Sequence, residues 1–276
     1  MMIRLLTGDD NPEVQAYLER NYMETALLSG NLARCGITND RMSRRAGDYY
    51  GYFSAGRLEG ILAFFNLGNV VPHFEAAKAI GSFIEIMRQR RFEVLVGMKR
   101  QVEPLYLALA PYKKVRECEN SYYLVNQEIR PYSLTCLHQI AAVEAVDRET
   151  ALTFMVEAYR QGFKRRFNQA LAIKLIEDRG QEETLLFLLI NKVPVAQAII
   201  QVATGRINQI GGVYTSEQSR GKGYCKALVA ELCRQIHAAD KIPTLMVRKD
   251  NSPALRAYQA LGFTYYDEYL IVKFAV

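Results

Sequence analysis

The chain has 276 residues, of which 50% are apolar and 23% are charged. This composition is typical of a globular protein with a sizeable core, and it excludes a disordered, collagen-like or low-complexity chain. The 35 basic and 29 acidic residues give a formal charge of +6, which suits an anionic ligand but is too diffuse to indicate nucleic acid. At about 150 residues per domain, the length predicts two domains.

The apolar runs and the cysteines exclude several other classes of protein. The clean apolar runs are short, such as residues 185–190, so we expect no membrane span. The N-terminus has no apolar segment of the kind that marks a signal peptide. Five scattered cysteines and three widely separated histidines predict neither a disulfide framework nor a metal site. We therefore expect a reduced, soluble, cytoplasmic protein.

The first half of the chain predicts a mixed order of helices and strands. A helix is expected at residues 12–34, and strands are expected at 49–54 and 58–67 around an Ala55-Gly56 turn, with residues 69–71 continuing or ending the second strand. There follow a helix at 75–90, a strand at 92–96, a helix opened by Glu103-Pro104 that runs to Ala110, and a strand at 120–126. The aromatic residues Phe64, Phe65, Tyr122 and Tyr123 are expected in the core.

The second half predicts a similar order of elements. It begins with a helix at residues 149–179, strands at 185–190 and 195–202 joined by an Asn191-Lys192 turn, and a strand at 206–215. A helix at 225–239 follows, with Leu228, Leu232 and Ile236 on one apolar face, and then a strand at 244–247. The last elements are a helix with Ser252 as its N-cap and Pro253 as its first residue, ended by Gly262, and one long strand or a strand pair over 263–274. The parallel between the halves predicts two α/β domains, 1–130 and 131–276.

The strongest chemical signal is a glycine-rich turn between a predicted strand and a predicted helix. It has the pattern Q-x-x-G-x-G from Gln218 to Gly223, and Arg220 and Lys222 add two positive charges. Glycines let the backbone approach a ligand, and the following helix directs its first N–H groups and the positive end of its dipole at the same point. The turn therefore indicates a cradle for a pyrophosphate, although a basic surface turn is the plain alternative.

Residues 140–276 resemble the GNAT superfamily of acyl-CoA N-acyltransferases. The resemblance depends on the strand at 206–215, on the turn at 218–223, and on Asn-Ser-Pro-Ala-Leu-Arg-Ala-Tyr at 251–258 running into Leu-Gly-Phe at 261–263. Both motifs occur in the family's order, separated by a helix and a strand. The resemblance implies two GNAT-like mixed α/β domains in tandem, each with a central, mostly antiparallel sheet flanked by helices.

The same resemblance implies a role for individual residues. The strand residues Val213, Tyr214 and Thr215 would pair with the pantetheine arm of acetyl-CoA. The pyrophosphate would be held by Gln218, Arg220, Gly221, Lys222, Gly223, Tyr224 and Cys225. Asn251 and Ala254 would contact the far side of the cofactor. Tyr258 would lie near the thioester sulfur and protonate the departing thiolate, although packing in its helix is the alternative.

A general base is harder to identify. Related enzymes often carry a glutamate on the strand before the turn, but residues 206–215 contain neither Asp nor Glu. The remaining candidates are Glu157, Asp267 and Glu268, each of which could instead be an ordinary solvated charge. A chain of water molecules, or an amine that is already neutral, would remove the need for a dedicated base. A backbone N–H near Val213 could stabilise the oxyanion of the transfer.

The first half lacks the corresponding motifs. Residues 71–75, Val-Pro-His-Phe-Glu, stand where the glycine turn would be, and Leu109 stands where Tyr258 would be. We expect a GNAT-like fold there without a cofactor. Its expected roles are completing the acceptor pocket, packing between domains, or forming a homodimer.

The sequence therefore predicts an N-acetyltransferase that moves the acetyl group of acetyl-CoA directly to a primary amine. The acceptor could be a small molecule or a protein, with no metal, nucleic acid or membrane involved. One alternative is a non-catalytic acyl-CoA-binding or sensor protein, which the missing strand carboxylate permits. The other is a tandem aminoacyl-tRNA-dependent transferase, against which the glycine turn argues because such an enzyme has no need of it.

Overall fold

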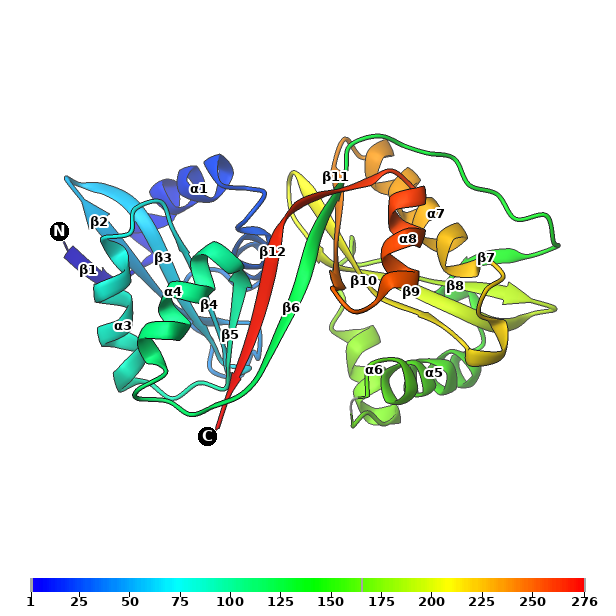
Figure 1. The fold of residues 1–276 in the computed structure, drawn as a ribbon, viewed down its shortest axis with the longest axis horizontal. Helices are drawn as coiled ribbons and strands as arrows, with labels where there is room; N and C mark the ends of the chain where they lie inside the picture. Colours follow the sequence, from blue (N-terminus) through cyan, green and yellow to red (C-terminus); the bar gives the residue numbers. More distant parts are fainter. Residues whose placement is uncertain (1, 165, 276) are drawn as a thin grey trace. The chain divides into compact units, whose positions relative to one another are not determined.

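The structure is a computed structural model that describes residues 2–164 and 166–275. Its chain divides into two compact units. Unit 1 comprises Met1–Tyr123, Arg248–Asp250 and Tyr266–Val276, and unit 2 comprises Leu124–Val247 and Asn251–Tyr265. The two long strands β6 (Val115–Asn126) and β12 (Phe263–Phe274) each contribute residues to both units (Figure 1). Each unit is described by itself below.

Unit 1 is built on a mostly antiparallel sheet. Its strands follow the order β1-β2-β3-β4-β5-β12, and only the pairing of β4 with β5 is parallel. The strands before β6 are β1 (Met2–Leu5), β2 (Gly47–Ser54), β3 (Arg57–Phe65), β4 (Asn69–Phe74) and β5 (Val94–Met98). The end of the chain closes this sheet, because Tyr269 to Lys273 of β12 pair with β5.

The helices of unit 1 begin and end differently from the sequence-based expectation. They are the 3-10 turn η1 (Gly8–Asp10), α1 (Asn11–Arg20), α2 (Ala26–Cys35), α3 (Ala79–Gln89) and α4 (Lys99–Leu109). The single helix expected over 12–34 is wrong, because the buried Thr25 hydroxyl donates to the carbonyls of Leu18 and Asn21 and so ends α1. Pro104 lies inside α4 rather than at its start, since α4 follows directly on β5.

Residues 69–74 form a strand of their own, and residues 75–78 separate it from α3. The apolar faces of α3 and α4 pack on the sheet in one core, in which Phe83, Leu95 and Leu105 are fully buried. The expected burial of Phe64, Phe65 and Tyr123 is confirmed, whereas Tyr122 is half-buried.

Unit 2 has a second, mostly antiparallel sheet. Its strands follow the order β7-β8-β9-β10-β11, and only β10 and β11 are parallel. They are β7 (Gln139–Ala142), β8 (Leu185–Ile190), β9 (Val193–Ala203), β10 (Ile207–Thr215) and β11 (Ile242–Arg248). The Asn191-Lys192 turn between β8 and β9 is confirmed, and both residues have positive φ (50° and 65°), as the tightest hairpin turns require.

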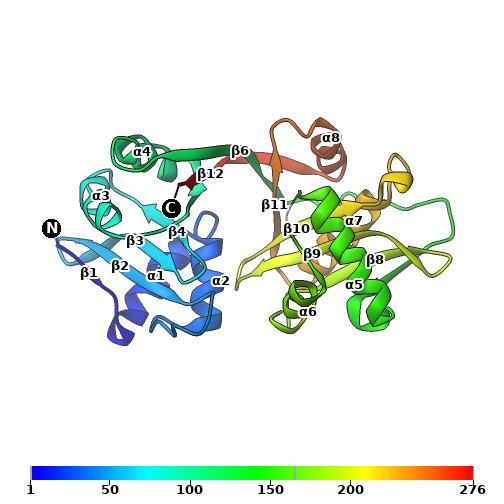
Figure 2. The same ribbon diagram turned by 90° about the horizontal axis from the view of Figure 1, so that it is seen from below.

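Helices flank both faces of this sheet (Figure 2). They are the 3-10 turn η2 (Val143–Ala145), α5 (Arg148–Glu157), the π-helical turn η3 (Ala158–Gly162), α6 (Gln169–Glu177), the 3-10 turn η4 (Glu217–Ser219), α7 (Tyr224–Ala238) and α8 (Ser252–Ala260). The single helix expected over 149–179 is wrong: η3 follows α5, and Asn168 caps a separate α6. In α7, Leu228, Leu232 and Ile236 form the expected buried stripe.

The architecture confirms the predicted mixed α/β fold with sheets flanked by helices. None of the helices among the described residues combines the length and the apolar character that a bilayer span requires.

In unit 1, the buried side chain of Gln101 lies where the parallel strands β4 and β5 separate. The pairing of β4 with β5 covers Asn69 with Val94 and Val70 with Leu95. Further along β4, the backbone N–H of Phe74 donates to Gln101 Oε1 at 2.9 Å, and Gln101 Nε2 donates to the Phe74 carbonyl at 3.2 Å. Gln101 is 5% exposed, so its carboxamide replaces a missing strand partner at this point.

Removing that carboxamide should leave both backbone groups of Phe74 without a partner. We expect Gln101→Met, which keeps the length of the side chain, to destabilise unit 1 by about 1–3 kcal/mol. Hydrogen exchange at the Phe74 amide should accelerate accordingly. The exposed Gln89 at the end of α3 offers a control, since Gln89→Met should change neither quantity. Unchanged exchange in Gln101→Met would show that Gln101 does not hold this strand.

Candidate functional site

The site begins where β10 and β11 separate. Their parallel pairing runs from Ile207 with Ile242 to Ile210 with Leu245. Beyond it, β10 continues to pair with β9 through Tyr214 and Thr215. The edge of Val213 to Thr215 on the side of β11 lies beyond the paired register, so β11 does not use its backbone groups, and the Thr215 carbonyl accepts instead from the Arg220 side chain.

A bulge in β10 accompanies this separation. Gly211 faces Ile199 on β9 but Tyr214 faces Gln197, so β10 has one more residue than its partner over this stretch. Gly212 has a φ of +58°, and a Cβ added there would lie 2.8 Å from the Ile199 side chain. The glycine pair in the middle of the predicted strand therefore allows the strand to bulge.

The glycine turn follows β10 directly. Gly221 and Gly223 have φ values of +79° and +83°, which strain other L-residues. Gly223 is the N-cap of α7, and the N–H groups of the first helical turn lack partners within the helix. Nothing lies within 4 Å of a Cβ built on Gly221, so the turn is open at that residue.

Positive charge surrounds the turn. Arg220 and Lys222 are exposed, and Gln218 is exposed beside them. The Arg220 side chain donates to the Thr215 carbonyl at 3.4 Å, which returns it toward the end of β10. Glu217, 3.9 Å from the Arg220 guanidinium, offsets part of this charge, and Lys222 and the N-terminus of α7 supply positive potential that suits a phosphate.

The sequence motifs did not predict that Tyr132 contacts the glycine turn. A Cβ on Gly223 would collide with the hydroxyl of Tyr132, which comes from the segment between β6 and β7. The Lys226 ammonium lies 4.5 Å from the centre of the Tyr132 ring. The linking segment is therefore packed on the start of α7.

The first two residues of α7 are packing residues in this structure. The Tyr224 side chain is buried, and its burial together with a hydrogen bond to Cys136 raises its pKa. Burial also raises the pKa of the Cys225 thiol. A helix start favours a thiolate, but here the loss of solvation outweighs that effect, so Cys225 is a neutral thiol.

Asn251 has a clear structural role. Its Oδ1 accepts the N–H of Ala254 at 3.3 Å and so caps α8. The expectation that Ser252 is the N-cap and Pro253 the first helical residue is wrong by one position, because Ser252 already lies in the helix. Asn251 is exposed and Ala254 is half-buried.

Tyr258 lies on the buried face of α8. Its side chain is 6% exposed, and its ring packs edge-on against Phe263 with the centroids 5.9 Å apart. Burial raises the pKa of Tyr258, and the neighbouring Cys225 contributes in the same direction. The structure thus brings Tyr258 beside the first turn of α7, immediately after the glycine turn.

The three candidate carboxylates have different surroundings. Glu157, at the end of α5, accepts the hydroxyl of Tyr214 at 3.0 Å, and burial and this bond raise the pKa of Tyr214 to about 12. Asp267 and Glu268 belong to unit 1. Asp267 lies 3.3 Å from the Arg100 guanidinium. Hydrogen bonds from Lys249, Lys99 and Asn120 hold the pKa of Glu268 at about 2, which makes it a poor base.

A buried neutral amide, which the sequence motifs did not indicate, lies at the bulge. Gln197 is 1% exposed, and its Nε2 donates to the Gly212 carbonyl at 3.3 Å. Among the described residues, Gln197 Oε1, Asn208 Oδ1 and Thr215 Oγ1 are buried without a hydrogen-bond partner. A buried, unpaired polar atom is costly, which is typical of places where water or a ligand binds.

Unit 1 has no counterpart of the glycine turn. The corresponding residues form β4 and lead into α3 without a glycine. His73 is 3% exposed, and both of its ring nitrogens are occupied: Nδ1 lies 2.6 Å from the Tyr17 hydroxyl and Nε2 lies 3.2 Å from Glu24. Among the described residues, no three His, Cys, Asp or Glu side chains form a cluster that could hold a metal ion.

Comparisons with known proteins agree with this geometry. Residues 194–272, from β9 to β12, match the family described as FR47-like protein. No match was found among the curated proteins. Among solved structures, a Drosophila protein is 11% identical, with a TM-score of 0.73 over 99% of this chain and 98% of its own.

Two further solved structures share this fold. A GCN5-related N-acetyltransferase from Sphaerobacter thermophilus is 13% identical, with a TM-score of 0.62 over 99% of this chain and 95% of its own. A tandem GNAT protein from the clavulanic acid biosynthesis pathway is 12% identical, with a TM-score of 0.57 over 98% of this chain and 97% of its own. At these identities the likeness establishes the fold.

The cap of α8 gives a direct test of the role of Asn251. We expect Asn251→Ala to remove the acceptor for the Ala254 N–H and to cost about 1 kcal/mol of stability. In thermal unfolding this corresponds to a decrease of about 2–4 °C. Asn251→Asp should restore the cap, because its carboxylate accepts the same N–H and favours the helix N-terminus. Equal melting of all three proteins would contradict the capping role.

Proposed function

We propose that this tandem GNAT-fold protein, whose residues 194–272 match the FR47-like family, is an N-acetyltransferase. In this proposal unit 2 binds acetyl-CoA and catalyses transfer of its acetyl group to a primary amine. Unit 1 binds no acetyl-CoA, since its glycine turn is absent and Gln101 already satisfies the backbone of Phe74.

One observation carries the proposal. The free edge of Val213 to Thr215 and the glycine turn are consecutive along the chain, and the N-terminus of α7 follows them. A ligand with an amide-rich arm and a pyrophosphate would find hydrogen-bonding groups on the strand and positive charge on the turn. The residues present thus fit acetyl-CoA, and the open space at Gly221 leaves room for a phosphate.

When bound, acetyl-CoA supplies an activated acetyl thioester. The chain must then stabilise the negative charge that develops on the acetyl oxygen, and the Val213 N–H on the free edge is the donor we assign to this task. Tyr258 donates a proton to the departing sulfur from its hydroxyl. The Tyr258 hydroxyl is protonated at physiological pH, as an ordinary phenol also is, and burial raises its pKa further.

The incoming amine must lose a proton, and Glu157 is the carboxylate we assign to receive it. Glu157 is bonded to Tyr214, a residue of the separated strand, whereas Asp267 and Glu268 are engaged with cations of unit 1. β10 itself contains neither Asp nor Glu, so it supplies no carboxylate of its own.

Cofactor binding can be tested at Gly221. We expect Gly221→Asp to abolish the increase in melting temperature that acetyl-CoA gives to the parent protein, because a carboxylate would face the pyrophosphate. Gly221→Asn is the matched control, since Asn has the same shape and tolerates positive φ but carries no charge. It should retain most of the shift. A full shift in a folded Gly221→Asp protein would remove the turn from the binding site.

Catalysis can be tested at Tyr258. We expect Tyr258→Phe to keep the ring packed, to bind acetyl-CoA as the parent does, and to lower the release of CoA thiol with an added amine by ~10²–10⁴-fold. The exposed Tyr112 gives a matched control, because Tyr112→Phe should not affect turnover.

The pH profile tests the raised pKa of Tyr258, separately from its role in proton transfer. A free phenol loses its proton near pH ~10. The raised pKa of Tyr258 keeps the proton on its hydroxyl beyond that point, so any fall in the rate near pH 10 should persist in Tyr258→Phe.

Turnover of Tyr258→Phe within a few-fold of the parent would restrict Tyr258 to packing. Binding of acetyl-CoA without thiol release for any amine would instead favour the non-catalytic sensor.

A further inference from the structure

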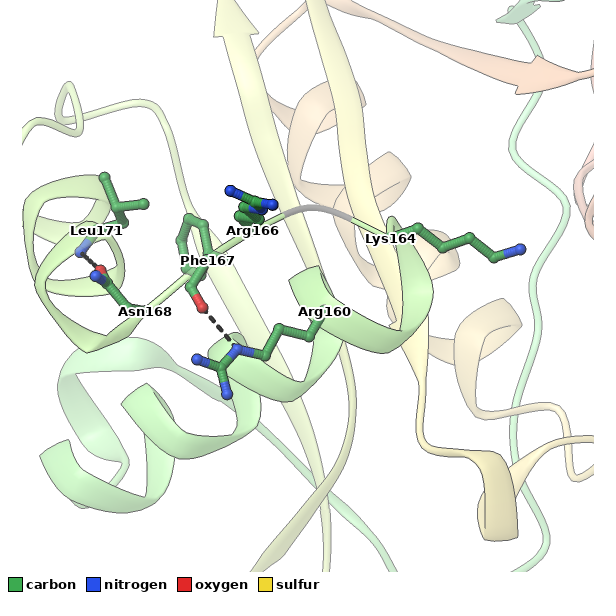
Figure 3. Close-up of a pocket in the computed structure, with 6 residues that line it drawn as sticks. All are labelled: Arg160, Lys164, Arg166, Phe167, Asn168 and Leu171. Atoms are coloured by element: carbon green, nitrogen blue, oxygen red, sulfur yellow. Dashed lines mark hydrogen bonds between the residues drawn. The ribbon is translucent and has the colours of Figure 1, made fainter.

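A basic hollow in unit 2 has no role in binding acetyl-CoA as described above. It has a volume of about 650 Å³ and lies beside η3 and the start of α6 (Figure 3). Its lining residues are Arg160, Lys164, Arg166, Phe167, Asn168 and Leu171. Arg160, Lys164 and Arg166 thus place three cations at the hollow, with the Lys164 side chain directed away from the Arg160 guanidinium (Figure 3).

Among residues 2–164 and 166–275, no ion pair joins Arg160, Lys164 or Arg166 to a carboxylate. The acids nearest in sequence, Glu149 and Glu157, accept instead from the neutral side chains of Gln169 and Tyr214. Arg160 donates its Nε to the Phe167 carbonyl at 2.7 Å, which leaves the rest of its guanidinium for other acceptors (Figure 3). Uncompensated like charges raise the free energy of the surface, and an anionic group relieves that cost.

Two features give the hollow ordered walls. The Phe167 ring stacks on Tyr159 with their centroids 4.0 Å apart, which gives the hollow an ordered aromatic wall. Asn168 caps α6 by accepting the Leu171 N–H at 3.0 Å, so the positive end of that helix opens on the same space.

The hollow is connected to the separated strand through η3. Gly162 packs so closely on the Tyr214 ring that a Cβ there would collide with it. The Tyr214 hydroxyl also bonds Gln161 at 3.2 Å, in addition to Glu157. The turn that carries Arg160 is thus held against β10, on the residue that neighbours Val213.

We infer that this hollow binds an anionic group, a carboxylate or a phosphate, of the amine acceptor. The inference rests on the proposed acetyltransfer and deepens it by naming the acceptor class as amines that carry a negative charge. Arg160 and Arg166 bind the anion through charge-assisted hydrogen bonds, and the attachment of η3 to β10 places the amine of the same molecule toward the separated strand.

The experiment compares matched acceptors on the full chain with saturating acetyl-CoA. The pairs are O-phosphoethanolamine with ethanolamine, and β-alanine with β-alaninamide, each followed by release of CoA thiol. We expect the anionic member of at least one pair to have a kcat/KM about 10–100-fold higher. A preference within the phosphate pair alone would identify a phosphate site, and one within the carboxylate pair alone a carboxylate site.

Variants of the hollow then test whether its arginines cause the preference for the anionic acceptor. Arg166→Gln should reduce it about 10-fold, and Arg160→Gln should do so as well, whereas Arg160→Lys should restore part of it. Lys192→Gln, at the tip of the β8–β9 hairpin, removes one positive charge elsewhere in unit 2 and should leave the preference unchanged. Equal kcat/KM values within both pairs, or a preference that survives in Arg166→Gln and Arg160→Gln, would overturn the inference.

A binding measurement separates this inference from the proposed reaction. With saturating CoA to occupy the glycine turn, O-phosphoethanolamine and β-alanine should be titrated calorimetrically into the parent protein and the same variants. Binding that is lost in Arg166→Gln but kept in Lys192→Gln supports the hollow even if no amine is acetylated. Absence of binding by both anions would overturn the inference even if a neutral amine is acetylated.

Discussion

The geometry of unit 2 depends on the separation of two parallel strands. β10 and β11 pair over four residue positions and then part, and the extra residue in β10 near Gly212 falls in the stretch that follows. A strand edge with unpaired N–H and C=O groups is costly if nothing binds it. The structure limits that cost to a short stretch, directly before a turn whose helix also has unpaired N–H groups. Two sets of unsatisfied donors therefore lie next to each other along the chain.

Unit 1 shows the same constraint met in a different way. Its parallel strands β4 and β5 pair at two positions, and the Gln101 carboxamide supplies the donor and the acceptor that Phe74 lacks. A side-chain amide has the same hydrogen-bonding groups as a peptide, so it can complete a strand without a ligand. One unit thus closes the opening with its own side chain, whereas the other leaves its strand edge accessible.

Charge is distributed unevenly within unit 2. The glycine turn and the hollow beside η3 both present cations, while the buried amide at the bulge, that of Gln197, is neutral. Glu157 is the exception, and it is bonded to Tyr214. The fixed positive groups favour anionic ligands at the glycine turn and at the hollow. The Glu157 carboxylate, between β10 and α5, remains as a proton acceptor.

The sequence by itself determined the elements whose signals are local. The run of apolar residues in β8, the Asn191-Lys192 turn, the stripe of α7 and the glycine turn were all predicted at their observed places, because each depends on residues close together in the chain. The breaks in the long predicted helices were missed, although Gly162 and Asn168 were signals for one of them. Tertiary structure alone decided that Tyr269 to Lys273 return to pair with β5, that Gln101 fills a strand edge, that Tyr132 covers Gly223, and that Glu157 reaches Tyr214. These contacts join residues that lie far apart in sequence, and their free energy depends on packing that no local pattern encodes.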